Sequence, residues 1–289
     1  MVIDFSAPPY VTINQVGMIE DIIRRARESP SLKIPTTSPK SPAIEQLFEG
    51  SPDSPPLSED AQTTFHSLLA KFNFVAGCGR QDLTLALSGL LKRVVSPSEE
   101  DERKLARFIG YAISTNDLTL RLRCHLPPNV TTFIDASFAT HSNMKSHSGV
   151  CITLGTGAYY SKPTAQKLNT TSSCEAELVA LSKGLPQSLW TSYFIENQGY
   201  PTSPITVLQD NQSTITLVEN GRPTSELSRH IRIGYLWLHD LILKNVVKLV
   251  YCPTEFMIAD IMTEPLQGSL FRTMRDWIMG VVPCPMTVQ

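Results

Sequence analysis

The sequence predicts an α/β fold: a mixed five-stranded sheet with helices on its faces, preceded by a small helical domain. Beyond Pro128, segments with the two-residue alternation of strands are mixed with segments of helical periodicity. The first three strands are separated by hairpin-length gaps, whereas the later ones are separated by helices. The sheet should therefore be antiparallel at first and then parallel. Residues 57–115, in contrast, carry three helical patterns in succession.

The overall composition limits what the protein can be. A chain of 289 residues is long enough for two domains, each with its own core. Its 25 basic and 27 acidic residues leave a net charge of -2, so a polyanion must meet a local basic face. The six cysteines include no C-x-x-C, which disfavours a structural zinc or a disulfide framework. Without a membrane-length apolar run or a signal peptide, we expect a cytoplasmic or nuclear protein that is not secreted and not in a membrane.

Residues 1–56 are expected to hold a strand–helix segment and a linker. The stretch VTINQ indicates a short strand, and the helix after it places Ile19, Ile22 and Ile23 at helical spacing. From Ser29 to Pro56 the chain is rich in proline and serine, a composition that keeps the backbone extended. We expect a linker or an arm that follows the surface.

Residues 57–128 are expected to form the helical domain. Ser58 can cap a first helix, and a second apolar helix should span about 82–95. Ser98, with Asp101 three residues on, is typical of the start of a third helix. The stretch LTLRLRC then alternates strictly, which predicts a half-buried strand with arginines on its outer side.

Residues 129–289 are expected to form the domain with the sheet. Its strands are predicted at 131–139, 149–155, 158–162, 205–210 and 246–252. Its helices are predicted at 173–197, 211–220, 229–245 and 255–262. Helices between the later strands would cover the faces of the sheet.

Two aspartates accompany predicted strands. Asp135 lies within TTFIDASFA, where both strand faces are otherwise apolar, and an unpaired buried carboxylate costs several kcal/mol. Asp210 closes the strand ITVLQD, at the kind of strand end where ligands gather in α/β sheets. Each residue also has an ordinary interpretation, as a hydrogen-bonded strand-end residue or as a helix cap.

Two further acids lie on predicted helices. Glu175 and Glu177 are two residues apart, so only one of them can face the sheet. Ala180 and Gly184 share the face of Glu177 and are small enough for close packing, which favours Glu177 over Glu175. Asp260 is the fourth candidate, although a helical aspartate is more often a surface residue. Four acids on four elements suit two Mg²⁺ ions about 4 Å apart that act on a phosphodiester.

The sequence resembles the carboxyl-terminal part of copia-type retrotransposon polyproteins, from the end of the reverse transcriptase through its ribonuclease H domain. The resemblance covers nearly the whole chain. FHSLLAKFNFVA, SPSEEDERKLARFIGY and NDLTLRL resemble the thumb and connection segments. IDASFA, TTSSCEAELVALS, LQDNQST, SRHIRI and YCPTEFMIADIMTEPL resemble the ribonuclease H part, in the same order.

This resemblance implies a ribonuclease H-like fold and cleavage of the RNA strand of RNA–DNA hybrids, leaving 3′-hydroxyl and 5′-phosphate ends. The metal-binding acids of the family match Asp135, Glu177, Asp210 and Asp260, which would hold two Mg²⁺ ions that Mn²⁺ can replace. The hybrid would be recognised by its shape and its 2′-hydroxyls. Candidate backbone contacts are Ser172, Ser173, Asn211 and His230, each equally well explained as a cap or a satisfied polar group.

The chain departs from the family pattern at four positions: Gln81, Arg232, Gly234 and Glu264. These changes suggest relaxed selection or a specialised role, and they concern substrate binding more than metal binding. The paired aspartates of the polymerase palm are absent, because the sequence contains no Asp-Asp dipeptide. We therefore expect no polymerase activity from this fragment, and a palm domain from a longer polyprotein as a partner.

Three other functional hypotheses can be weighed on the sequence alone. A non-catalytic nucleic-acid-binding remnant would keep the fold without cutting, and the altered HIRIG segment favours it. An interaction module whose acids are ordinary surface groups is disfavoured by the complete set of four acids. An integrase-type strand transferase shares the architecture, but the order Asp, Glu, Asp, Asp fits ribonuclease H better.

Overall fold

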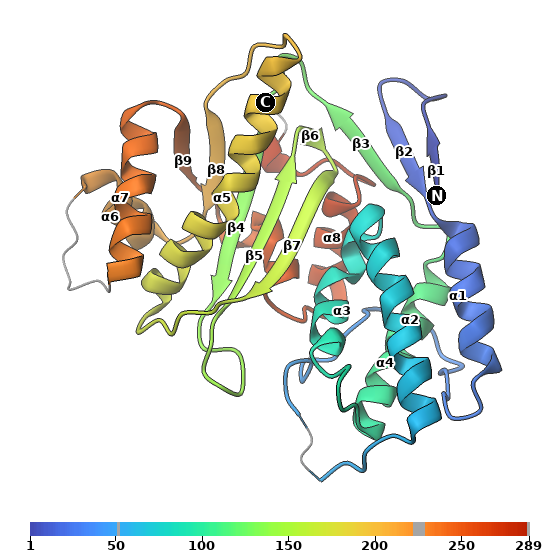
Figure 1. The fold of residues 1–289 in the computed structure, drawn as a ribbon. Helices are drawn as coiled ribbons and strands as arrows, with labels where there is room; N and C mark the ends of the chain where they lie inside the picture. Colours follow the sequence, from blue (N-terminus) through green and yellow to red (C-terminus); the bar gives the residue numbers. More distant parts are fainter. Residues whose placement is uncertain (51–52, 222–228, 288–289) are drawn as a thin grey trace.

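A five-stranded sheet lies at the centre of the molecule, with strand order β7-β5-β4-β8-β9 (Figure 1). The computed structural model describes residues 1–50, 53–221 and 229–287, and side chains of the helix that begins at 229 from residue 231 onward. Strands β4, β5 and β7 pair antiparallel, whereas β8 and β9 continue the sheet in parallel. This ribonuclease H-like arrangement confirms the predicted fold class. The strands are β4 Thr131–Ser137, β5 His147–Thr153, β7 Ala158–Ala165, β8 Ile205–Gln209 and β9 Val247–Tyr251.

The two faces of the sheet contribute to two different cores. Side chains alternate along β4, so Ile134 packs in one core while Phe133 packs in the other. On the Ile134 side lie three helices, which Figure 1 shows apart from the helical domain. They are α5 Ser173–Asn197, α6 Gln212–Asn220 and α7 Arg229–Leu243, all close to their predicted bounds. On the Phe133 side the sheet meets the helical domain, so its buried face needs no further cover.

The helical domain contains the three predicted helices. They are α2 Glu59–Cys78, α3 Thr84–Leu91 and α4 Glu99–Ser114, with a 3₁₀ turn at Gln81–Leu83 before α3. The Ser58 hydroxyl accepts a hydrogen bond from the Ala61 N–H, as an N-cap should. Ser98 and Asp101 form the predicted capping box, which satisfies two otherwise free amide groups of α4.

The N-terminal segment packs on this domain. Helix α1 (Val16–Glu28) buries Ile19, Ile22 and Ile23 in the same core as α2 and α4. The proline- and serine-rich segment lies along the surface as an arm, because it buries Leu47 and Phe48 and its carbonyls accept hydrogen bonds from Lys104. The proposed domain boundaries at 56 and 128 stay a prediction.

A small second sheet links the two parts of the chain. Its order is β1-β2-β3-β6, with all pairs antiparallel. The predicted strand at LTLRLRC is β3 (Leu120–Cys124), with Leu120 buried and Arg123 exposed. The other strands are β1 Val2–Asp4, β2 Val11–Asn14 and β6 Gly155–Thr156. Because β6 directly precedes β7, the pairing of β3 with β6 ties the helical domain to the central sheet.

The helix predicted at 255–262 is wrong. Two 3₁₀ segments occupy this region, η2 (Thr254–Phe256) and η3 (Ile258–Met262), and helix α8 follows at Gly268–Ile278. A 3₁₀ helix repeats every three residues, so Asp260 and Thr263 align on one ridge while the apolar residues of η3 are buried. Gly149 in β5 permits this close packing, since a Cβ there would lie 2.6 Å from the Ala259 carbonyl oxygen.

One of the departures from the family pattern has a structural explanation. A Cβ at Gly234 would lie 3.0 Å from the Cβ of Ser182, so the glycine lets α7 pack closely on α5. Gln81 is buried in the 3₁₀ turn before α3. Arg232 and Glu264 are exposed, and their change of charge therefore acts at the surface.

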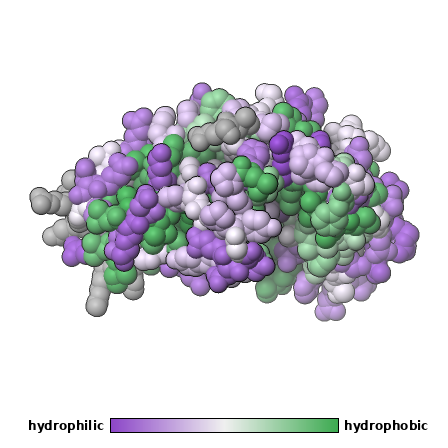
Figure 2. All heavy atoms as spheres, turned by 90° about the horizontal axis from the view of Figure 1, so that it is seen from above, coloured by the Kyte–Doolittle hydropathy of each residue, from purple (hydrophilic) through white to green (hydrophobic). Residues whose placement is uncertain are grey.

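The surface seen in Figure 2 mixes hydrophilic and apolar residues. Trp190 and Phe194 are among the exposed apolar side chains, and their rings stack at 5.5 Å on α5. Among the described residues, no helix has both the length and the apolar character needed to span a membrane.

Candidate active site

Asp135 lies near the carboxyl end of β4, opposite Gly149 of β5. Its side chain is half-buried, and its Oδ2 accepts a hydrogen bond of 2.5 Å from the Thr263 hydroxyl. Burial raises the pKa of Asp135 to about 6; the Thr263 hydrogen bond opposes the shift, while the charge of Asp210 adds to it. The carboxylate thus sits where the strand meets η3, without a cation to pair with among the described residues.

Asp210 follows β8 directly, at the neighbouring strand end. Strands β4 and β8 run parallel and are hydrogen-bonded, so their carboxyl ends meet at one edge of the sheet. The Thr254 hydroxyl lies 3.4 Å from Asp210 Oδ2, and the side chain is half-buried. Burial raises the pKa of Asp210, and nearby hydrogen-bond donors partly oppose this. The cap of α6 is Asn211, so the alternative of Asp210 as the helix cap is wrong.

Glu177 reaches the same edge from helix α5. It is only 4% exposed, whereas the Glu175 carboxylate lies at the surface and accepts from the amide and hydroxyl of Thr171. The argument from small residues is confirmed, because Ala180 is buried and a Cβ at Gly184 would lie 2.7 Å from a methyl of Val150. Of the two glutamates, it is therefore Glu177 that faces the sheet.

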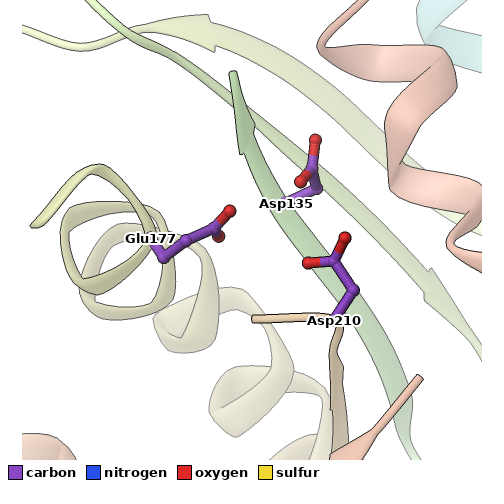
Figure 3. A group of neighbouring side chains, drawn as sticks. All are labelled: Asp135, Glu177 and Asp210. Atoms are coloured by element: carbon purple, nitrogen blue, oxygen red, sulfur yellow. The ribbon is translucent and has the colours of Figure 1, made fainter. Parts of the chain in front are cut away.

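The structure brings three of the four predicted acids together. Each of Asp135, Glu177 and Asp210 offers a carboxylate oxygen, and these oxygens lie within 4.8 Å of one another. In Figure 3 the three side chains extend from a strand, a helix and a strand end toward a shared space.

Asp260 lies beside this group and not within it. Asp260 lies on η3, which packs against β4 and β5. Burial raises the pKa of Asp260 to about 9, and the charges of the nearby Asp135 and Asp210 add to the shift. Glu264 contributes to the raised pKa of both Asp260 and Asp135. Acidic groups therefore cluster at this end of the sheet, where they resist ionisation together.

The donor set fits a divalent cation of the magnesium type. Mg²⁺ takes oxygen ligands and is commonly held by a few carboxylates. No Lys or Arg in the described part of the chain forms an ion pair with Asp135, Glu177, Asp210 or Asp260. Buried carboxylates without such a partner favour either protonation or a bound metal ion.

The predicted backbone contacts have other roles in the structure. Ser172 caps α5 by accepting from the Glu175 N–H, and Asn211 caps α6 by accepting from the Thr214 N–H. Ser173 is exposed at the first position of α5. His230 lies in α7, but its side chain is outside the described part of the structure. A cap at the surface can still meet a phosphate, so these contacts stay predictions.

Two residues of the site were missed from the sequence. Gln209, fully buried at the end of β8, donates from Nε2 to Glu177 Oε2 at 3.0 Å. Thr263, also fully buried, donates to Asp135. Gln209 directly precedes Asp210, and Thr263 lies three residues after Asp260. This nearness to a candidate acid is the signal in the sequence that could have drawn attention to them.

Comparisons with known proteins agree with the resemblance of the motifs. No protein-family model matches the chain. It is 28% identical over 218 residues to the Gag-Pol polyproteins of transposons Ty1-JR2 and Ty1-MR1 of Saccharomyces cerevisiae, covering 73% of this chain and 12% of each polyprotein. The chain is related to copia-type retrotransposon polyproteins. It spans about 12% of the length of these curated relatives.

Solved structures show weaker similarity to this retrotransposon-related chain. LC11-RNase H1, isolated from compost by a metagenomic approach, is 13% identical over 47% of this chain and 92% of its own, with a TM-score of 0.36. A foamy viral protease-reverse transcriptase in complex with dsDNA is 15% identical over 72% of this chain and 40% of its own, with a TM-score of 0.35.

Proposed function

We propose that this chain is a metal-dependent endoribonuclease that hydrolyses the RNA strand of RNA–DNA hybrids. The observation that carries the proposal is the convergence of Asp135, Glu177 and Asp210 at one edge of a ribonuclease H-like sheet, with Asp260 beside them. The relationship to Gag-Pol polyproteins of transposons supports a nucleic-acid substrate.

The four acids would hold two Mg²⁺ ions, which Mn²⁺ can replace. Bound ions of this kind stabilise the charge that develops on a phosphoryl group and lower the pKa of a coordinated water. The hydrogen bonds from Gln209 and Thr263 fix the orientation of Glu177 and Asp135 before any ligand arrives. Preorganised ligands of this kind cost no rearrangement during the reaction.

The proposed reaction is hydrolysis, so it needs water and no other reactant. The water oxygen bonds to phosphorus while the bond from phosphorus to the 3′ oxygen breaks. The proton lost by the water ends on the departing oxygen. The products are a 3′-hydroxyl and a 5′-phosphate, and the DNA strand stays whole.

The surrounding polar residues would position the hybrid. Ser173 is exposed at the start of α5, four residues before Glu177, where free amide groups of the helix also favour an anion. Ser172, Asn211 and His230 are the further proposed backbone contacts. As a larger partner, we propose a polymerase palm domain from a longer polyprotein, in the cytoplasm or the nucleus.

A cleavage assay with matched variants tests the function. The protein with Mg²⁺ should cut a labelled RNA–DNA hybrid and spare double-stranded DNA, and EDTA should stop the cutting. Asp210→Asn should abolish cleavage without unfolding the protein, because the amide keeps the volume but loses the charge of a metal ligand. Asp117→Asn, at an exposed turn after α4, is the control and should cut normally.

Two outcomes would contradict the proposal. Full activity of Asp210→Asn would remove the metal site from the mechanism. A wild-type protein that binds hybrid but never cuts it would instead identify a non-catalytic remnant.

A further inference from the structure

A cationic pocket lies between the helical domain and the edge of the central sheet. It is formed by the end of α3, the connection between β4 and β5, and the end of β7, and its volume is about 320 Å³. Its charged lining residues are Lys92, Arg93, Lys145 and Lys167, and no Asp or Glu of the described residues lines it. This concentration of positive charge contrasts with the net charge of -2 on the whole chain.

Most of these cations have no carboxylate partner. Among the residues the structure describes, Lys92, Lys145 and Lys167 form no ion pair. Arg93 alone approaches a carboxylate, that of Asp101, at 3.9 Å. The positive charge of the pocket is therefore left for a ligand to neutralise.

The base of the pocket is built from buried rings. Lys92 Nζ lies 3.3 Å from His141 Nε2 and 5.1 Å from the centroid of the Phe48 ring. His141 Nε2 in turn lies 2.9 Å from Nδ1 of the fully buried His147. Burial, together with the charge of Lys92, lowers the pKa of His141 to about 4, and burial also lowers the pKa of Lys92 to about 8. An anion near Lys92 would offset the cost of burying its positive charge.

The pocket is close enough to the acids to serve the same duplex. Asp135 of β4 pairs with Gly149 of β5. Two residues further along β4, Ser137 pairs with His147 of β5, and His147 pairs in turn with Ala165 of β7, which lines the pocket. With about 3.4 Å per residue and about 4.8 Å between strands, Ala165 lies roughly 12 Å from Asp135. A nucleic-acid strand, with about 3.4 Å of axial rise per phosphate, covers that distance in a few nucleotides.

We infer that this pocket binds a backbone phosphate of the hybrid whose strand lies on the acids. The inference rests on the proposed function, because it needs a polyanion seated on the same edge of the sheet. Lysines act as point charges toward phosphate and carry no sequence preference. A base is not the expected ligand, since the Phe48 ring is buried and already covered by Lys92.

The salt dependence of binding tests the inference. Lys145→Gln combined with Lys167→Gln removes two charges from the pocket at side chains that are half-buried and exposed. Lys244→Gln combined with Lys248→Gln removes the same charge from exposed positions near β9, at the opposite edge of the sheet. Hybrid affinity is measured in EDTA, so that the strand stays intact, over a range of salt concentrations.

The pocket variant should lose about one phosphate contact. The slope of log affinity against log salt should fall by about 1, and affinity at 0.1 M salt should drop about eightfold. The control should keep the wild-type slope. Equal slopes in the two variants would overturn the inference, and so would binding of inorganic phosphate at the pocket without any change in hybrid affinity.

The failure of this inference differs from the failure of the proposed function. If the wild type cuts the hybrid normally but the pocket variant shows the same salt dependence of binding as the control, only the phosphate-site inference is rejected. If the hybrid is not cut in the presence of Mg²⁺ but its binding depends on Lys145 and Lys167, only the proposed cleavage activity is rejected.

Discussion

Gln209 holds Glu177 in place across the sheet edge. Its Nε2 donates to Glu177 Oε2 at 3.0 Å, and its Oε1 accepts the Asn211 N–H at 2.8 Å. The second hydrogen bond fixes which end of the amide faces the glutamate. Gln209, the last residue of β8 and the neighbour of Asp210, thereby orients a carboxylate that α5 supplies.

Gln209→Ala should weaken the metal site without removing a ligand. Loss of an outer hydrogen bond to a ligand costs about 10- to 100-fold in metal affinity or activity. We expect the Mg²⁺ concentration for half-maximal cleavage to rise accordingly. Gln198→Ala, at the exposed end of α5, should leave this concentration unchanged. An unaltered Mg²⁺ requirement in Gln209→Ala would show that Glu177 needs no support.

Asp260→Asn should stabilise the metal-free protein at neutral pH. The native pKa of Asp260 is raised to about 9, so the native state resists the ionisation that the unfolded chain accepts near pH 4. Stability is therefore lost as pH rises from about 4 toward 9, and the amide avoids this loss. In EDTA at pH 7 we expect Tm to rise by about 2 to 5 °C, and at pH 4 by almost nothing.

The effect of Mg²⁺ on Tm checks this prediction, because the ion should favour the wild type over the variant. The ion should raise Tm of the wild type, because it neutralises the ionised acids, and should raise Tm of Asp260→Asn less. A lower Tm for the variant in EDTA at pH 7 would mean that the Asp260 carboxylate is not repelled by its neighbours.

Gly149→Ala should displace η3 from the sheet. The added Cβ would lie 2.6 Å from the Ala259 carbonyl oxygen and 2.8 Å from the Cβ of Met262, and both positions are fixed by packing. We expect a destabilisation of about 1 to 3 kcal/mol in denaturant unfolding. Cleavage should fall further than stability alone explains, because η3 carries Asp260 and leads to Thr263.

Gly17→Ala serves as the matched control for that substitution. Gly17 lies in α1, and a Cβ there would meet no packed neighbour within 4 Å among the described residues, so alanine should stabilise the helix by up to about 1 kcal/mol. Cleavage by this variant should be normal. If the two glycine variants behave alike, close packing at Gly149 does not support the site.

Asp82→Ala should destabilise the helical domain strongly. Arg80 is only 1% exposed and makes two hydrogen bonds to Asp82, while the Tyr111 hydroxyl donates to the same carboxylate. Removing the carboxylate leaves a buried guanidinium without its counter-charge, at a cost of about 3 to 5 kcal/mol. Tyr111→Phe removes one hydrogen bond and should cost about 1 to 2 kcal/mol. Urea unfolding of both variants measures the difference.

Much of the fold follows from local patterns in the sequence. Helix α5 has the predicted bounds, and the capping box at Ser98 and Asp101 is present. Such features depend on residues a few positions apart, which interact in any context. The prediction of a helix at 255–262 failed because the 3₁₀ form of η3 depends on close packing against Gly149, a residue more than 100 positions away.

The candidate site divides in the same way. Asp135 could be named as a lone carboxylate in an apolar strand, Asp210 from its strand end, and Glu177 from a helix face of small residues, all visible in the sequence. Gln209 and Thr263 could not, since their importance depends on which atom of another element lies opposite. The helix face favoured Glu177 over Glu175, and the burial of Glu177 in the structure decided between them.

The sequence by itself determined the strands of the central sheet, most of the helices and the acids available for a metal site, because periodicity and capping are properties of neighbouring residues. Only the tertiary structure decided that three carboxylates approach within 4.8 Å, that Asp260 stands beside them, and that four cations line one pocket. Those distances depend on how the sheet, η3 and the helical domain pack together. Packing of this kind joins residues that no local pattern relates.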